Sequence, residues 1–308
     1  MNVWAIALAS LAVIFAATGF WLYTPDIPRN VLEDRYGVKP TDYVTAAGVR
    51  LHVTDTGPRD APPIILLHGF GSSLQTFDAW VPALARNHRV IAYDQPGFGL
   101  TGADPTGDYS DERNVLVLGA LMDKLGVSRA SLVGHSMGGK LAWQFAAANP
   151  ARVDRLVLIA PDGFASAGFE YNKAPDIPLM LRALPYTMPR FLFRQTLVPA
   201  FGDPAKLTEP VAKRYFDMMR APGVRRAIVI KTGQTVLRDP LPLLHSIQAP
   251  VLLIWGDKDQ MIPITNAADY MGALPHATLK TLQGVGHVVQ EEAPVAGLED
   301  IEAFLTAP

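Results

Sequence analysis

One serine in this chain has neighbours that could make its hydroxyl a nucleophile. Ser136 stands in Gly134-His135-Ser136-Met137-Gly138, which fits the pattern G-x-S-x-G. A run typical of a buried strand precedes it and a run with helical spacing follows, which is the context that this pattern requires. The two glycines remove the Cβ atoms that would clash where the strand and the helix pass close to each other. The predicted chemistry is attack by the serine hydroxyl on a carbonyl carbon.

Negative charge that develops on the attacked oxygen needs hydrogen-bond donors beside the serine. The backbone N–H of Met137 is the first candidate, because it opens the predicted helix, where N–H groups lack intrahelical partners. The N–H of Phe70 is the second, in the sequence HGFG at 68–71, directly after the apolar run 63–67. Glycine on both sides of Phe70 lets the backbone approach a ligand closely. We therefore expect Phe70 and Met137 to form an oxyanion hole.

The serine also needs a base, which a histidine from another loop can supply. His287 ends the sequence GVGH at 284–287, just after the last predicted strand. Loops at the carboxyl ends of parallel strands converge on one site, so His287 is the predicted base. His68 and His135 belong to the two loops already described and are expected to line the site. The remaining histidines are expected to be structural or exposed: His52, His88, His245 and His276.

A carboxylate must hold the tautomer of the base and stabilise the imidazolium that forms. The sequence GDKD at 256–259 offers Asp257 and Asp259 after the predicted strand 251–255. The residues alone do not distinguish the two. Either aspartate gives the chain order Ser, Asp, His.

Short β-rich runs alternate with amphipathic runs, which predicts a mostly parallel sheet flanked by helices. The expected strands are 43–46 and 49–55 as a hairpin, then 63–67, 89–93, 130–134, 153–159, 251–255 and 277–282. The expected helices are 74–86, 111–125 with Ser110 as N-cap, 137–148, 264–274 and 295–305. Residues 162–248 contain no clear strand and many prolines, which predicts an inserted cap of short helices.

Composition excludes several classes of protein. Hydrophobic residues make up 49% and charged residues 18% of the 308 residues, which suits one large core and not a disordered chain. The net charge of -2 provides no basic field for nucleic acid, so no nucleic-acid partner is expected. The chain contains no cysteine, so a disulfide framework and a cysteine nucleophile are excluded.

Residues 3–23 carry no charged side chain. A helix that crosses a bilayer needs about 20 apolar residues, so this run predicts a membrane anchor. We favour an anchor over a cleavable signal, because no Lys or Arg precedes the run and no well-placed A-x-A follows it. Signal cleavage, which would leave a secreted or periplasmic enzyme, is the alternative. The membrane side of the catalytic domain is not predicted.

The chain from about residue 43 to 305 resembles the α/β-hydrolase family, in particular its serine esterase and lipase-like members with a helical cap. The matching segments, in the family's order, are HGFG at 68–71, DQPGFGLTG at 94–102, GHSMGG at 134–139, WGDKDQMIP at 255–263 and GVGH at 284–287. The resemblance implies an eight-stranded α/β sheet with a cap between its sixth and seventh strands. It also implies that the acid is Asp259. The expected organisation is an anchor or signal helix at 1–24, a linker at 25–42, a core at 43–161 and 249–308, and a cap at 162–248.

No cofactor and no metal are predicted. The sequence GFGLTG at 97–102 fits a dinucleotide-binding pattern, but Asp-Pro and Gly soon after it would break the helix that such a site requires. Histidines and carboxylates at metal-ligand spacing are absent from the sequence.

The predicted function is hydrolysis of a small carboxylic ester through an acyl-enzyme, with an apolar acyl or alcohol group. A carbon-carbon bond hydrolase or a perhydrolase would use the same triad. A binding protein of the same fold without catalysis is the alternative from another class. The oligomeric state is not predicted.

Overall fold

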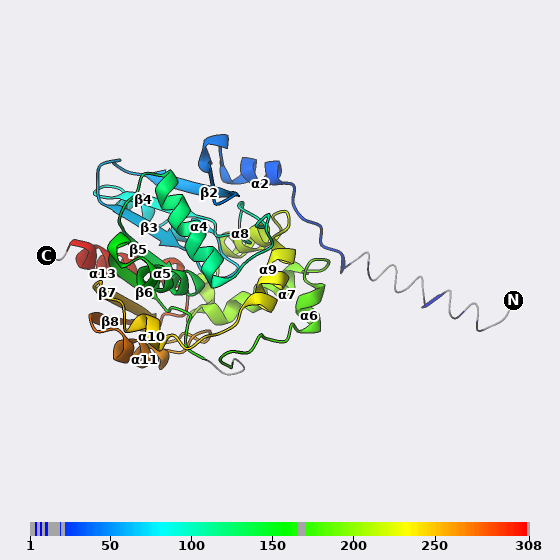
Figure 1. The fold of residues 1–308 in the computed structure, drawn as a ribbon. Coiled ribbons are helices and arrows are strands. Elements are labelled where there is room, and N and C mark those ends of the chain that lie inside the picture. Colours follow the sequence, from blue (N-terminus) through cyan, green and yellow to red (C-terminus); the bar gives the residue numbers. More distant parts are fainter. Residues whose placement is uncertain are drawn as a thin grey trace.

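An eight-stranded, mostly parallel sheet forms the centre of the molecule (Figure 1). The computed structural model describes residues 22–165 and 170–306, together with residues 4, 7, 10, 11 and 19. The strand order is β1-β2-β4-β3-β5-β6-β7-β8; β2 pairs antiparallel with β1 and β4, and the other neighbours are parallel. The strands are β1 (Tyr43–Ala46), β2 (Val49–Thr56), β3 (Pro63–Leu67), β4 (Arg89–Tyr93), β5 (Ala130–His135), β6 (Val153–Ile159), β7 (Val251–Gly256) and β8 (Ala277–Leu282). All eight predicted strands are confirmed to within one residue at each end.

Helices cover both faces of the sheet because its central strands are apolar on both sides. In β3, Ile65 and Leu67 pack with α4 and α5, whereas Ile64 and Leu66 pack on the other face with α3 and α13. Successive side chains of a strand point to opposite faces, so a continuous apolar run needs two covering layers. The helices of these layers are α3 (Val81–Leu84), α4 (Asp111–Lys124), α5 (Met137–Ala148), α10 (Leu241–Leu244), α11 (Asn266–Ala273), α12 (Val289–Glu292) and α13 (Pro294–Thr306).

Most of the predicted helices form, and one is divided. Ser110 caps α4 as expected, since its hydroxyl accepts a hydrogen bond from the backbone N–H of Arg113 at 3.2 Å. The predicted helix 74–86 is instead a 3-10 turn, η2 (Leu74–Phe77), followed by α3. Pro82 lies in the first turn of α3, the part of a helix where a missing N–H costs least.

Residues 162–248 lie between β6 and β7, and we call them the cap. Their described helices are α6 (Leu179–Ala183), α7 (Arg190–Leu197), α8 (Glu209–Met219) and α9 (Val224–Gln234), with 3-10 turns η4 (Val198–Ala200) and η5 (Pro204–Lys206). A 3-10 turn, η3 (Pro150–Arg152), precedes β6, and another, η1 (Pro40–Asp42), precedes β1. Figure 1 shows α6 to α9 grouped beside one edge of the core.

The prediction of a membrane-spanning helix over residues 3–23 is wrong. No helix in the described part of the chain is long and apolar enough to cross a bilayer. A span needs about 20 residues, and α4, the longest helix after residue 22, has 14. Most of residues 3–23 lie outside the described residues.

The segment 25–42, expected to be a linker, contains the helix α2 (Arg29–Tyr36), which packs on the cap. Leu32 of α2 is fully buried in an apolar cluster, most of whose other buried members belong to the cap. The carboxylate of Asp217 in α8 accepts hydrogen bonds from Arg35 at 2.7 Å and Tyr36 at 2.9 Å. Sequence periodicity missed α2 because most of its residues are polar and its burial depends on one leucine.

Candidate active site

Ser136 stands at the turn between β5 and α5, in a strained backbone conformation. Its φ of 53° and ψ of -119° lie in a region of backbone conformation that residues other than glycine rarely adopt. A Cβ on Gly134 would overlap the carbonyl group of Gly138, and a Cβ on Gly138 would overlap the carbonyl group of Leu67. The glycines of this motif are therefore required by the close approach of β5, α5 and β3.

We expect Gly138→Ala to unfold or strongly destabilise the protein, because the added methyl meets backbone atoms of β3 that cannot move independently. The free energy of unfolding should fall by about 3 kcal/mol or more, within the range of overpacked core substitutions. Gly272→Ala is the matched control, since a Cβ on this helical glycine meets no atom within 4 Å. It should stabilise the protein by about 0.5 to 1 kcal/mol through helix propensity. Urea unfolding of both variants checks the pair, and equal stabilities would contradict the close-packed turn.

The two loops expected to donate to an oxyanion touch each other. A Cβ on Gly69 would lie 3.2 Å from Cβ of Ser136, so the loop that carries Phe70 runs directly beside the serine. In the described part of the chain, neither the N–H of Phe70 nor that of Met137 donates a hydrogen bond. Phe70 is 52% exposed, and its ring packs edge-on against Phe98, with ring centres 5.5 Å apart.

His287 and Asp259 form a buried pair. Nδ1 of His287 lies 2.7 Å from Oδ2 of Asp259, and the two side chains are 6% and 0% exposed. The other carboxylate oxygen of Asp259 accepts hydrogen bonds from the backbone N–H groups of Met261 and Ile262, at 2.8 and 2.9 Å. Asp257 instead accepts from the N–H of Gly284 at 2.6 Å. The geometry therefore separates the two aspartates, and only Asp259 contacts the histidine.

His135, the residue before the serine, brings the His287 loop to the turn. Its Nε2 lies 2.9 Å from the carbonyl oxygen of His287, and the two ring centres are 4.6 Å apart. Burial, assisted by the neighbouring His287, holds the pKa of His135 well below its usual value. A neutral ring with its proton on Nε2 donates to that carbonyl. No described hydrogen bond joins the Ser136 hydroxyl to His287, so this pairing stays a prediction.

The ring of His68 makes hydrogen bonds within its own loop and to Gln95. It is fully buried, and its Nε2 accepts a hydrogen bond from the N–H of Gln95 at 3.0 Å. Its Nδ1 donates to the carbonyl oxygen of Gly69 at 2.8 Å. Burial lowers the pKa of His68, so the ring is neutral near pH 7.

Two buried carboxylates that the sequence analysis did not single out hold the loops around this site. Asp94 accepts hydrogen bonds from His52 and from the N–H groups of Leu74 and Leu100, each at 2.7 Å. Glu292 accepts three backbone hydrogen bonds, one of them from Gly286, the residue before His287. Both acids lie in or near segments that carry recognisable motifs, but no spacing rule identifies what they bind.

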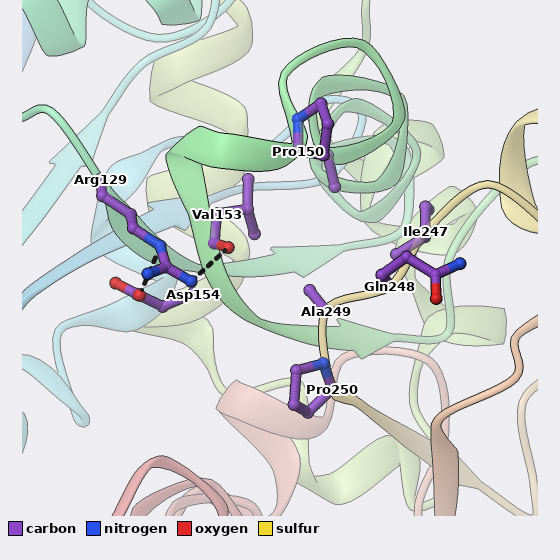
Figure 2. A pocket seen from close by; sticks show the side chains of 9 residues that line it. Arg129, Pro150, Val153, Asp154, Ile247, Gln248, Ala249 and Pro250 are labelled. Atoms are coloured by element: carbon purple, nitrogen blue, oxygen red, sulfur yellow. Dashed lines mark hydrogen bonds and ion pairs between the residues drawn. The ribbon is translucent and has the colours of Figure 1, made fainter.

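A pocket at the opposite end of the strands, where β6 and β7 begin, is separate from these residues. It is lined by Val153 and Pro250, at the amino ends of β6 and β7, and by the ion pair of Arg129 with Asp154 (Figure 2). Ser136 lies at the carboxyl end of β5. Among the described residues, no cluster of three or more His, Cys, Asp or Glu side chains could hold a metal ion.

Comparison with known proteins establishes the class. Residues 62–294 match the family model described as alpha/beta hydrolase fold, and the chain belongs to this family. It is 34% identical, over 82% of its length, to the dihydrolipoyllysine-residue acetyltransferase component of the acetoin cleaving system of Pseudomonas putida. The chain spans 65% of the length of that relative. The resemblance to this fold family is thereby confirmed.

Two further relatives are hydrolases. The chain is 28% identical to 2-hydroxy-6-oxo-6-phenylhexa-2,4-dienoate hydrolase of Burkholderia cepacia, over 79% of this chain and 86% of that protein. A solved meta-cleavage product hydrolase from Pseudomonas fluorescens IP01 superposes with a TM-score of 0.72 and 27% identity, covering 85% of this chain and 96% of that one. The chain is therefore similar, within the alpha/beta hydrolase fold family, to two enzymes that are hydrolases.

Proposed function

We propose that this protein is a serine hydrolase that cleaves a bond next to a carbonyl group through an acyl-enzyme. The observation that carries the proposal is the buried His287–Asp259 pair beside the strained turn of Ser136. In this proposal Ser136 is the nucleophile, His287 the base and Asp259 the acid that orients it. The N–H groups of Phe70 and Met137 hold the oxyanion.

The proton path follows from the hydrogen bonds of His287. Because Nδ1 is bound to Asp259, Nε2 is the nitrogen that takes the proton of the Ser136 hydroxyl as its oxygen attacks the carbonyl carbon. The imidazolium then gives this proton to the leaving group, and the acyl group stays on the serine. Water, deprotonated by the same nitrogen, attacks the acyl-enzyme, and a carboxylic acid is released.

The relatives support a carbon-carbon bond as the one that is cleaved. Two of them are hydrolases whose names specify a 2-hydroxy-6-oxo-dienoate or a meta-cleavage product. A carbon leaving group departs only when it is protonated or its charge is delocalised, as in a vinylogous diketone. A carboxylic ester is the second candidate, because an alkoxide needs only the proton of His287 and the same oxyanion donors.

Assays of the purified full chain on three substrate sets test the proposal. They are a coloured vinylogous 6-oxo-dienoate, 4-nitrophenyl esters of short and medium acyl chains, and peroxide with a carboxylic acid. We expect the dienoate to give the highest kcat/KM, with slower ester cleavage, since both pass through the same acyl-enzyme. A higher kcat/KM on esters than on the dienoate would assign esterase activity. Formation of a peracid, detected by its oxidation of a reporter dye, would assign perhydrolase activity. Folded protein that turns over none of them, and that a fluorophosphonate does not label, would favour a binding protein.

A further inference from the structure

The loop that carries His287 is attached to the cap as well as to the sheet. The backbone N–H groups of His287 and Val288 both donate to the carbonyl oxygen of Ala200 in η4, at 2.8 and 3.3 Å. Val288 is 4% exposed and packs in an apolar cluster whose other buried members all belong to the cap: Ala200, Phe201, Leu207 and Ala212. The residue after the proposed base is therefore a part of the cap's own core.

One buried carboxylate joins the same two segments. Oε2 of Glu292 accepts hydrogen bonds from the N–H groups of Gly202 at 3.0 Å and Gly286 at 2.7 Å, and Oε1 accepts from the N–H of Asp203 at 2.7 Å. Gly286 immediately precedes His287, whereas Gly202 and Asp203 belong to the cap. Glu292 is 7% exposed, and a buried carboxylate is retained only where such charge-assisted hydrogen bonds replace water.

The two segments are too close to adjust independently. A Cβ on Gly286 would overlap the backbone N of Gly202, and a Cβ on Gly202 would lie 2.6 Å from the carbonyl oxygen of Gly284. On the other side of the loop, a Cβ on Gly256 would overlap the carbonyl oxygens of Val285 and Gly286. The loop is thus held between β7 and the cap, with the Glu292 carboxylate at the junction.

We propose that Glu292 is a positioning residue for His287, which fixes the loop 284–288 to cap residues 200–203 so that the base is placed only when the cap is seated. The inference rests on the proposed function, in which His287 is the base. Misplacement of a catalytic group by about 1 Å can lower the rate about 100-fold. Loss of the hydrogen bond between Glu292 and the N–H of Gly286, the residue before His287, is therefore expected to lower kcat.

The adjacent Glu291 provides a matched control. Its carboxylate also links cap and core, because it accepts hydrogen bonds from Thr76 at 2.6 Å, Arg214 at 2.6 Å and Tyr215 at 2.9 Å. None of these groups belongs to the loop 284–288. Removal of its charge should weaken the attachment of α8 and leave Arg214 unpaired, without changing the hydrogen bonds of Gly286.

The experiment compares Glu292→Gln with Glu291→Gln in the full chain. Glutamine keeps the shape of Glu292 but has an NH2 group in place of one carboxylate oxygen. This NH2 group cannot accept a hydrogen bond, so at least one of the three backbone N–H groups loses its acceptor. We expect Glu292→Gln to lower kcat and the rate of fluorophosphonate labelling at Ser136 by about 10-fold or more, with KM changed less than about 3-fold. Glu291→Gln should lower the melting temperature and leave the labelling rate of the folded protein within about 3-fold of wild type. Glu292→Asp keeps the charge but withdraws it by one methylene, so its labelling rate should be intermediate.

Labelling of folded Glu292→Gln at the wild-type rate, or a loss confined to KM, would overturn the inference. If Glu292→Gln does not fold, Glu292→Asp decides by the same two measurements, and failure of both to fold would assign Glu292 to folding alone. A wild-type protein that is itself unlabelled would refute the proposed function instead, so the two failures are distinguishable.

Discussion

Replacement of Ser136 by alanine is expected to lower kcat/KM by about 10⁴-fold or more and to abolish fluorophosphonate labelling, because the attacking oxygen is removed. The substitution deletes one atom at a turn whose φ of 53° strains serine and alanine alike, so folding should be retained. Kinetics on the best substrate, mass spectrometry of the labelled protein and circular dichroism check these outcomes together.

Ser131 provides the control for this prediction. It is a buried residue near the amino end of β5, the strand that ends directly before Ser136, and so lies away from the turn. Ser131→Ala should keep kcat/KM within about 3-fold of wild type and keep full labelling, as expected for a substitution without a catalytic role. Label found on a residue other than Ser136 would contradict the assignment of the nucleophile.

The second large effect concerns Asp259. Asp259→Asn keeps the size of the side chain but removes the charge that would stabilise an imidazolium, and its amide can hold His287 in the wrong tautomer. We expect kcat to fall by about 10³- to 10⁴-fold, with the protein still folded. Steady-state kinetics and thermal unfolding of the purified variant provide the measurement.

Asp257→Asn is the matched comparison, two residues earlier on the same loop. Its carboxylate accepts from the Gly284 N–H and does not contact His287, so kcat should stay within about 3-fold of wild type. An equal loss of kcat in the two variants, or a larger loss in Asp257→Asn, would contradict the assignment of Asp259 as the acid that supports His287.

Features that depend on neighbours in the chain could be predicted from the sequence. The eight strands are continuous apolar or β-rich runs bounded by turn residues, and each was placed to within one residue. The turn at Ser136 needs small residues on both sides, and Gly134 and Gly138 stand at the positions where a Cβ would overlap backbone atoms. Ser110 could be recognised as a cap because capping is a contact between residues three apart.

Features that depend on distant partners were missed or wrongly predicted. The helix α2 carries little apolar periodicity, and it is ordered by contacts with α8 that no local pattern encodes. The apolar run 3–23 has the composition of a membrane span, yet no described helix is long and apolar enough to be one.

By itself, then, the sequence determined the order of the strands along the chain, the glycine-framed serine and the fold family, because backbone sterics and apolar periodicity act over short separations. The tertiary structure decided which aspartate meets His287 and where the carboxylate of Glu292 makes its hydrogen bonds. The reason is physical: a buried carboxylate must find donors in three dimensions, and those of Glu292 come from Gly202, Asp203 and Gly286, in two segments that meet only when the cap folds onto the sheet.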